Sequence, residues 1–264
     1  MTSTARPPPR IAAAQSISVA GDIAANVLIH TRFVTAAHQC GVDLLVFPEL
    51  SLSGYEPPQL RDCLLKLTDT RLAPIWNLVR QTGMTVVVGA SFLQENRPAL
   101  SIAAFTFFPD GTSSVYCKQH LYPGEGQYAA PGDTGHQRHE VRDTSYALAI
   151  CADTSQPSHA QAAAATGAAL YLAGVLVSEA GYAADSTQLA QYAQQFNIGV
   201  LMANHGGPSG GYLSAGKSAF WAPGRAVVVA APGPGDWLVI ANRHAGQWLG
   251  ELLAVQTYEY CPKR

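Results

Sequence analysis

Short apolar runs alternate with segments of helical periodicity along most of the chain. Runs of strand length lie at 10–15, 42–47, 84–92, 146–151, 168–173 and 198–203. Helices are predicted at 21–40, 71–82, 157–166 and 183–196. Two β-rich segments flank Pro109-Asp110-Gly111 and predict a hairpin, and late strands are predicted at 226–231 and 237–241. This alternation predicts an α/β fold with one mixed sheet or two, as a single domain over 1–264 whose residues 1–9 form a frayed leader.

The chain is unusually poor in charge. Charged residues make up 13% of the 264 residues and apolar residues 48%, against a usual charged share of about 25%. Such a surface is compatible with a face that is covered by another subunit. The net charge is 16 − 18 = −2, and no basic run exceeds two residues. A nucleic-acid partner is therefore not expected, because it requires a lysine- and arginine-rich face.

Neither a membrane span nor a disulfide framework is expected. A bilayer-spanning helix needs about 20 apolar residues, and the nearest candidate, 162–177, is alanine-rich and interrupted by glycine. The N-terminal segment is only weakly similar to a signal peptide, because Gln15, Ser16 and Ser18 interrupt its apolar stretch. The five cysteines are odd in number and form no C-x-x-C. We therefore expect a reducing, cytoplasmic setting.

The stretch "GYLSAGKS", Gly211 to Ser218, matches the G-x-x-x-x-G-K-[ST] pattern of phosphate-binding loops. In such a loop a helix begins at the Lys-Ser pair, and the helix N-terminus binds phosphate. Here Pro223, Gly224 and β-branched residues follow within a few positions. A nucleotide site is therefore rejected.

Three strand-like segments each end at a chemically reactive side chain. "DLLVFPEL" leads to Glu49, "SSVYCK" to Lys118 and "YALAIC" to Cys151. Each residue also has an ordinary interpretation when it is taken singly. Cys151 could be an inert core thiol, Glu49 a loop carboxylate and Lys118 a solvated strand end. Taken together, a thiol, an ammonium and a carboxylate form a nucleophilic site in which the carboxylate moves protons. Lys118 is expected to lower the thiol pKa below its usual value of about 8.5.

The surroundings of these residues resemble the signatures of the nitrilase superfamily, the carbon–nitrogen hydrolases. Residues 47–55 match F-P-E-L-x-L-x-G-Y, and Lys118 opens a K-x-H-L segment that is followed by Glu125 and by Pro-Gly-Asp at 131–133. Cys151 opens a C-x-D segment. "VLMANHGG" and "SAGKSAFWAPGRAVV" are similar to later segments of the family, so the resemblance runs from about residue 10 to about residue 242.

The resemblance implies a four-layer α-β-β-α sandwich that commonly forms homodimers. It also implies amide hydrolysis through a thioester, with Cys151 as the nucleophile and Glu49 as the proton carrier. Lys118 and the backbone N–H of Ala152 would stabilise the oxyanion, and Glu125 would hold the lysine and the substrate. No metal or organic cofactor is expected, because side chains and backbone supply every group that this chemistry needs.

The implied substrate is a small neutral or weakly polar amide. The tryptophan or tyrosine that often follows the cysteine in the family is replaced by Ala152, and the arginine and phenylalanine of many amidases are replaced by Ser155 and Gln156. Without that arginine, a carboxylate-bearing substrate lacks a bidentate partner. The residues expected to line the pocket are Tyr55, His120, Tyr122, Tyr128, Ser155, His159, Asn204 and His205.

Other functions remain open at this stage. The departures at Ala152 and Ser155 allow a catalytically silent binding or scaffold protein on the same fold. A nitrile hydrolase and a glutaminase-like subunit that serves a separate synthetase are further alternatives. A Cys-His pair with His120 or His159 as the base is disfavoured, because it leaves Glu49 and Lys118 unexplained. The "HQRH" stretch at 136–139 has loose metal-ligand spacing but no third ligand nearby, so a solvated loop is predicted.

Overall fold

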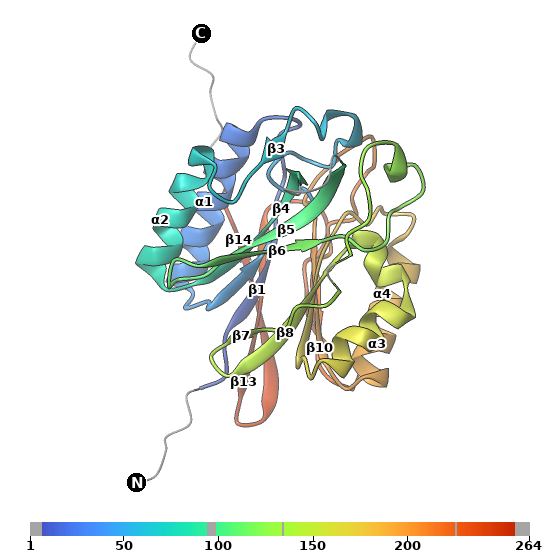
Figure 1. Ribbon diagram of the computed structural model, residues 1–264. Coiled ribbons are helices and arrows are strands. Elements are labelled where there is room, and N and C mark those ends of the chain that lie inside the picture. Colours follow the sequence, from blue (N-terminus) through green and yellow to red (C-terminus); the bar gives the residue numbers. More distant parts are fainter. Residues whose placement is uncertain (1–6, 94–98, 134, 225, 257–264) are drawn as a thin grey trace.

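The predicted alternation of strands and helices folds into two β-sheets with helices on both outer faces (Figure 1). The computed structural model describes residues 7–93, 99–133, 135–224 and 226–256. Helices α1 (Ile23–Gln39) and α2 (Ala73–Thr82) cover the first sheet, and α3 (Pro157–Ala165) and α4 (Tyr182–Gln195) cover the second. The expected α-β-β-α sandwich is confirmed.

The first sheet combines parallel central strands with antiparallel flanks. Its spatial order is β14 (Gln247–Ala254), β13 (Trp237–His244), β1 (Ile11–Gln15), β2 (Leu44–Val46), β4 (Thr85–Leu93), β5 (Leu100–Phe107) and β6 (Ser113–Cys117), with β3 (Leu64–Leu65) paired to β4. Strands β1, β2 and β4 are parallel, and β5 and β6 form the predicted hairpin. The carboxyl end of β2 therefore lies in the middle of this sheet.

The second sheet has the same mixed character. Its order is β12 (Val227–Ala230), β11 (Ala219–Trp221), β10 (Gly199–Asn204), β9 (Leu170–Val175), β8 (Thr144–Ile150) and β7 (His139–Val141). Strands β8, β9 and β10 are parallel. Cys151 follows directly after β8, so the thiol lies at the carboxyl end of a central parallel strand, where ligand sites of parallel sheets commonly form.

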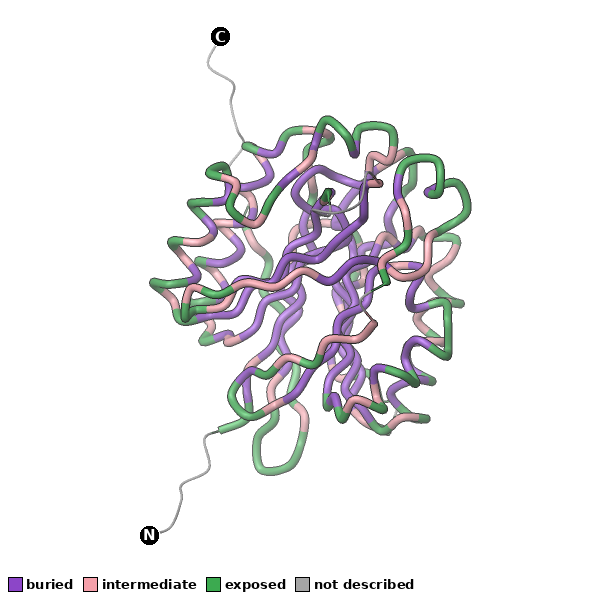
Figure 2. The backbone as a smooth tube through the Cα atoms, viewed as in Figure 1, coloured by how far each residue is buried: buried purple, intermediate pink, exposed green. Residues whose placement is uncertain are grey.

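Alternation along β1 shows why both faces of a sheet are buried. Ile11 and Ala13 pack in the layer between the sheets, together with Leu172 of β9. Ala12 and Ala14 point the other way and pack against the α1 side. Successive strand residues face opposite sides, so an all-apolar strand fits only where both sides are covered. In Figure 2 the strands are accordingly mostly buried, and exposed backbone gathers on the outer helices and loops.

The long elements agree with the sequence-based predictions, whereas four strands are additional. Strands β3, β7, β11 and β14 are absent from those predictions. Strand β11 begins at Ala219, directly after the GKS stretch, so a strand stands where a phosphate-binding loop needs a helix. Lys217 pairs with Glu179 at 2.8 Å. The reason for rejecting a nucleotide site is thereby confirmed.

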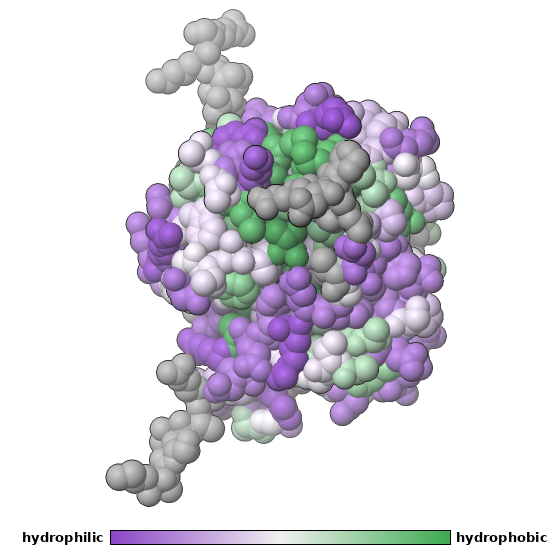
Figure 3. All heavy atoms as spheres, in the orientation of Figure 1, coloured by the Kyte–Doolittle hydropathy of each residue, from purple (hydrophilic) through white to green (hydrophobic). Residues whose placement is uncertain are grey.

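The surface is mixed in character. Figure 3 shows hydrophilic residues along the flanks of the visible face and an apolar area in its upper part, beside grey residues. No helix in the described ranges has both the length and the apolar character needed to cross a membrane. The edge strand β14 exposes Leu249, Leu252 and Leu253. Residues 1–6 of the predicted leader lie outside the described residues.

Candidate active site

Lys118 lies at the centre of a buried group of charged side chains. The residue follows directly after β6, and its Nζ donates to Oε1 of Glu49 at 2.6 Å. The same ammonium donates to both carboxylate oxygens of Glu125, at 2.7 and 2.8 Å. The three side chains are 0–1% exposed. Buried charges of this kind are stable only when they are paired, so one ammonium holds two carboxylates in fixed positions.

The loop that follows β2 brings Glu49 to this lysine. The next residue, Leu50, has a φ of +51°, which is unusual for a residue with a side chain. His205 donates from Nε2 to the Glu49 carbonyl oxygen at 2.7 Å, and the His205 side chain is fully buried. A strained turn and a hydrogen bond from the second sheet thus fix the backbone that carries the carboxylate.

The pKa of the Glu49 carboxyl group lies near neutral pH. Burial raises its pKa, the Lys118 ammonium opposes that rise, and the nearby Glu125 carboxylate adds to it, so that the pKa is about 7. Oε2 of Glu49 is buried without a hydrogen-bond partner in the described part of the chain. The Cys151 thiol interacts with the same carboxylate. A carboxylate of this pKa can both take up and release a proton near pH 7.

Cys151 occupies a sharp backbone turn. The residue has a φ of +42° and begins the 3-10 helix Cys151–Ser155 directly after β8. Its thiol donates to the Leu176 carbonyl oxygen at 3.8 Å. Strained backbone of this kind is often found at functional positions, and here it turns the side chain out of the strand.

The Cys151 thiol is neutral in the resting site. Burial raises its pKa, and the Glu49 carboxylate raises it further, whereas Lys118 lowers it to a smaller extent. Lys118 thus lowers the thiol pKa as expected, but the expectation of a pKa below the usual value is wrong, because burial and the Glu49 carboxylate together raise it more. The carboxylates of Glu49 and Glu125 raise the pKa of Lys118 although burial alone would lower it. The thiol thus keeps its proton at neutral pH, and the Glu49 carboxyl group lies beside it.

Glu125 is held by further hydrogen bonds. The Tyr55 hydroxyl donates to Oε1 at 2.7 Å, and the backbone N–H of Tyr122 donates to Oε2 at 2.7 Å. Both oxygens also accept from Lys118. Burial and the neighbouring carboxylates raise the pKa of Tyr55, so its phenol remains a donor. Glu125 therefore has its full set of partners and acts as a support for the lysine.

A pocket of about 130 Å³ opens beside Cys151. Its lining residues are Tyr55, Tyr122, Cys151, Ala152, Thr154, Ser155, Leu176, Val177, Ser178, Gly181, Asp185 and Tyr212. Four residues singled out from the sequence as supporting or lining groups, Tyr55, Tyr122, Ala152 and Ser155, lie on this wall. Asp185 and Tyr212 were not predicted, because neither lies in a segment that resembles the family signatures.

Other expected lining residues lie elsewhere in the described structure. Tyr128 is 38% exposed and lies outside this pocket lining. The fully buried Asn204 bonds backbone atoms of Val177 and Gly216 through its side-chain amide, so it supports the wall instead of forming it. His205 likewise bonds the Glu49 backbone. These polar residues are occupied in holding loops.

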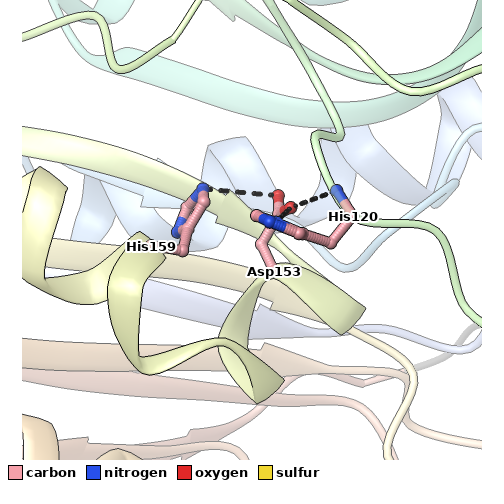
Figure 4. A group of neighbouring side chains, drawn as sticks. All are labelled: His120, Asp153 and His159. Atoms are coloured by element: carbon pink, nitrogen blue, oxygen red, sulfur yellow. Dashed lines mark hydrogen bonds and ion pairs between the residues drawn. The ribbon is translucent and has the colours of Figure 1, made fainter.

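His120 and His159 belong to a second polar group around Asp153 (Figure 4). Oδ1 of Asp153 accepts from the backbone N–H of His120 at 2.8 Å, and Oδ2 accepts from the Ile150 N–H at 3.0 Å. Asp153 thus ties the segment after Lys118 to the strand that ends at Cys151. Neither histidine lines the pocket described above, which leaves a Cys-His pair without support.

The same group offers three possible metal ligands. Atoms of His120, Asp153 and His159 lie within 4.8 Å of one another. The Tyr116 hydroxyl lies between two of these residues, donating to Asp153 Oδ2 at 2.7 Å and lying 2.8 Å from His159 Nε2. The Tyr171 hydroxyl lies 2.8 Å from His159 Nδ1. Hydrogen bonds therefore satisfy these atoms, and the group functions as a structural clamp.

The predicted solvated loop at 136–139 is wrong in two respects. His139 begins β7 and lies near the Tyr146 ring, with 5.4 Å between ring centroids. His136 is partly buried, and its ring centroid lies 4.2 Å from that of His159. The stretch packs against the second sheet because its histidines cover aromatic residues, which a spacing pattern does not reveal.

Comparison with known proteins identifies the family. The carbon–nitrogen hydrolase family model matches residues 10–247. The chain therefore belongs to the carbon–nitrogen hydrolase family. This range agrees with the extent of the resemblance seen in the sequence.

Several of the curated relatives are amidases. The chain is 34% identical over 154 residues to an (R)-stereoselective amidase of Pseudomonas sp, covering 56% of this chain and 53% of that protein. It is 30% identical over 166 residues to the N-carbamoylputrescine amidase of Solanum tuberosum, covering 59% and 55%. The chain thus spans about half the length of the curated relatives it matches.

A solved structure matches over nearly the whole fold. A cysteine-to-serine mutant of the Nesterenkonia AN1 amidase from the nitrilase superfamily superposes with a TM-score of 0.81 at 24% identity, covering 92% of this chain and 94% of that one. Another structure of that amidase contains butyramide. At this identity the likeness establishes the fold.

Proposed function

We propose that the protein hydrolyses a small amide through a thioester on Cys151. The observation that carries this proposal is the position of Cys151 on the wall of a small pocket, in electrostatic contact with the buried Glu49–Lys118–Glu125 group. Membership of the carbon–nitrogen hydrolase family supports it. The geometry supplies a nucleophile, a proton carrier and a fixed positive charge.

In the first half of the reaction the thiol loses its proton to Glu49, and the sulfur attacks the carbonyl carbon. A C–S bond forms, and the carbonyl electron pair moves onto oxygen. The Ala152 backbone N–H and the Lys118 ammonium stabilise this oxyanion. When the oxyanion collapses, the C–N bond breaks, and Glu49 returns its proton to the departing nitrogen. Ammonia or an amine leaves, and an acyl group remains on Cys151.

In the second half a water molecule attacks the thioester. Glu49, again a carboxylate, takes a proton from that water, and a second tetrahedral oxyanion forms in the same place. Its collapse breaks the C–S bond, and the proton passes from Glu49 to the sulfur. A carboxylic acid leaves, and the neutral thiol is restored. A Glu49 pKa of about 7 suits both directions of transfer.

Ammonia release from unbranched amides of two to six carbons tests this proposal. Wild-type protein is expected to release ammonia, and Cys151→Ala is expected to lose at least ~1,000-fold in kcat, as for removal of a covalent nucleophile. Cys40→Ala is the matched control, because this partly exposed thiol lies after α1. Full turnover by Cys151→Ala would refute the assignment.

Two further assays separate the alternatives. A silent scaffold predicts that Cys151 reacts with fluoroacetamide no faster than Cys40, whereas a live nucleophile reacts selectively. A nitrile hydrolase predicts faster ammonia release from butyronitrile than from butyramide. We expect selective labelling and a preference for the amide.

We also propose that the chain is a single-domain enzyme and that two copies form a homodimer. We propose that this dimer functions in the cytoplasm. The low charged fraction and the exposed leucines of β14 support a covered face. Cys40, Cys63 and Cys151 are free thiols, which suits a reducing compartment. Light scattering on the purified chain tests the dimer, and a monomer at micromolar concentration would contradict it.

A further inference from the structure

Asp185 lies on the wall of the pocket that holds Cys151. The residue is in the first turn of α4 and shares the wall with Ser178 and Gly181. An added Cβ on Gly181 would lie 3.4 Å from Oδ2 of Asp185, so the carboxylate folds back over this loop. Among the described residues that line this pocket, Asp185 has the one carboxyl group, and the other ionisable side chains are Cys151 and the tyrosines. The pocket therefore presents a carboxylate to whatever binds beside the nucleophile.

This carboxylate has no hydrogen bond or ion pair with any other side chain that the structure describes. Lys217, on the nearby loop, is engaged elsewhere: its Nζ bonds Oε1 of Glu179 at 2.8 Å and lies 5.0 Å from the Tyr182 ring centroid. Partial burial raises the pKa of Asp185, and no neighbouring cation offsets that effect. A carboxylate that no described side chain engages is available to pair with a group of a ligand bound in this pocket.

Three aromatic side chains complete the surroundings. Tyr55, Tyr122 and Tyr212 line the same pocket. Tyr55 and Tyr212 meet edge to face, with 6.1 Å between ring centroids. Aromatic faces attract cations by about 0.5–2 kcal/mol. A carboxylate and several tyrosines together are a suitable environment for an ammonium group and a poor one for a second carboxylate.

We propose that Asp185 and the tyrosines form a subsite for a positively charged group at the far end of the substrate, so that the preferred substrates are small amides that carry an amine. This inference rests on the proposed amidase function and names its substrate class. It refines the expectation of a neutral or weakly polar amide, which followed from the missing arginine. The absence of that arginine and the presence of Asp185 both disfavour an anionic substrate.

Asp185 also has a purely structural interpretation. An acidic residue in the first turn of a helix interacts favourably with the helix dipole. In that role, substitution of Asp185 changes the melting temperature but does not change how the rate depends on the charge of the substrate. The two interpretations therefore differ in whether substitution changes the ratio of rates for charged and neutral substrates.

A matched set of amides distinguishes them. Hexanamide, 5-aminopentanamide and 5-amino-5-oxopentanoate have similar lengths and carry a neutral, a positive and a negative end. The readout is kcat/KM for ammonia release by the wild-type chain and by Asp185→Asn, Asp185→Lys and Glu179→Gln. Glu179 is the matched control, because it is a carboxylate of the same region that bonds Lys217 and lies outside the pocket lining. Melting temperatures confirm that each variant is folded.

We expect wild-type protein to prefer 5-aminopentanamide over hexanamide by about tenfold, as for one charged hydrogen bond. Asp185→Asn is expected to lower that ratio about tenfold, and Asp185→Lys to reverse the preference toward the anionic amide. Glu179→Gln is expected to keep the wild-type ratio. Hydrolysis of hexanamide with no preference for the cationic amide, or an unchanged ratio in Asp185→Asn, overturns the subsite while leaving the amidase function intact. If none of the three amides, nor the shorter unbranched ones, is hydrolysed, the amidase function itself fails.

Discussion

At the scale of single residues, the site depends on how one ammonium is shared. Lys118 contacts Glu49 and Glu125 with three hydrogen bonds inside a fully buried group. Because two carboxylates share its charge, Lys118 cannot also turn the Cys151 thiol into a thiolate, and burial keeps the thiol protonated. In the proposed mechanism the thiol is therefore activated by a general base, and the proton leaves the sulfur only as the substrate is attacked.

The pH dependence of the rate should therefore follow Glu49. Burial raises the pKa of this carboxyl group to about 7, and only its ionised form accepts the thiol proton. We expect kcat/KM to rise with pH through an acid limb near pH 7 and to level off above it. Glu49→Gln should lose about 100- to 10,000-fold. A rate that is flat between pH 5 and pH 8 would contradict the role given to Glu49.

Glu125 should set the position of that acid limb. Its carboxylate raises the pKa of Glu49 through repulsion, so Glu125→Gln is expected to move the acid limb to lower pH. The same change weakens the hold on Lys118 and should lower kcat about 10- to 100-fold. The measurement is the pH profile of kcat/KM for butyramide. A lowered rate with an unmoved limb would show that Glu125 acts on Lys118 alone.

The limits of sequence-based prediction are also visible at this scale. Glu49 pairs with Lys118 and interacts with Cys151, and each of the three residues follows closely after a strand that the sequence predicts. Asn204 was expected on the wall but bonds backbone instead. Asp185 was missed, because an acidic residue in a helical first turn has an ordinary structural role. For polar residues of loops and helix ends, composition and spacing do not distinguish a structural role from a role in lining the pocket.

At the scale of elements, two glycines make room for the loop that carries Glu49. A Cβ on Gly89 of β4 would lie 2.2 Å from the Leu50 backbone nitrogen, and a Cβ on Gly174 of β9 would lie 2.7 Å from the Phe47 carbonyl oxygen. These glycines belong to different sheets, so the loop is held between the sheets by backbone contact on both sides. The position of Glu49 is thus fixed by packing as well as by Lys118.

Gly174→Ala should therefore affect both stability and catalysis. The added methyl group meets backbone atoms that cannot move freely, which costs about 1–3 kcal/mol of unfolding free energy. Displacing Glu49 by even part of an ångström should lower kcat about 10- to 100-fold. Denaturant unfolding and butyramide turnover measure the two effects.

Gly233→Ala is the control for this change, since a Cβ there meets nothing within 4 Å. It should leave turnover within about twofold of wild type. Equal activity of Gly174→Ala and Gly233→Ala would show that the loop adjusts and that close packing does not position Glu49.

The elements themselves were largely predictable, for reasons that differ between the long and the short ones. Central strands such as β4 and β9 are continuous apolar runs, and α1 has clear periodicity. Strands β3 and β11 have two and three residues, too few for any pattern. Strand β14 is mostly exposed, and its large apolar residues come in adjacent pairs instead of the alternation typical of a half-buried strand. The four-layer arrangement came from family resemblance, because apolar runs alone do not distinguish one mixed sheet from two.

At the scale of the whole molecule, three histidines are buried in different layers of the sandwich and are uncharged at neutral pH. Burial lowers the pKa of His30, His159 and His205 to about 4. His30 bridges the Asn26 carbonyl oxygen at 2.6 Å and the Ser51 hydroxyl at 2.9 Å, and its ring stacks on Phe47. His30 thus connects α1 to the loop that carries Glu49, and His205 bonds the Glu49 carbonyl oxygen from the second sheet.

Acid should therefore destabilise the fold before the ordinary carboxylates titrate. A histidine whose folded pKa is lowered from 6.5 to about 4 contributes stability that is fully present above pH 6.5 and is lost as the pH falls toward 4. Glu49 opposes this change, because its folded pKa of about 7 is raised, so its contribution increases as the pH falls from 7 to 4.5. With three histidines against one carboxyl group, we expect a net loss on the order of 5 kcal/mol between pH 7 and pH 4.5.

Thermal unfolding at a series of pH values measures this effect. The melting temperature should fall by about 10 °C or more over that range. His30→Asn should be less stable at pH 7 and should show a slope against pH that is about half as steep, because one of the three histidines is gone while the opposing contribution of Glu49 remains. His38→Asn, which changes an exposed histidine near the end of the same helix, should keep the wild-type slope. An equally steep slope in His30→Asn would mean that His30 takes up its proton without cost, and that the acid sensitivity of the sandwich has its origin outside this ring.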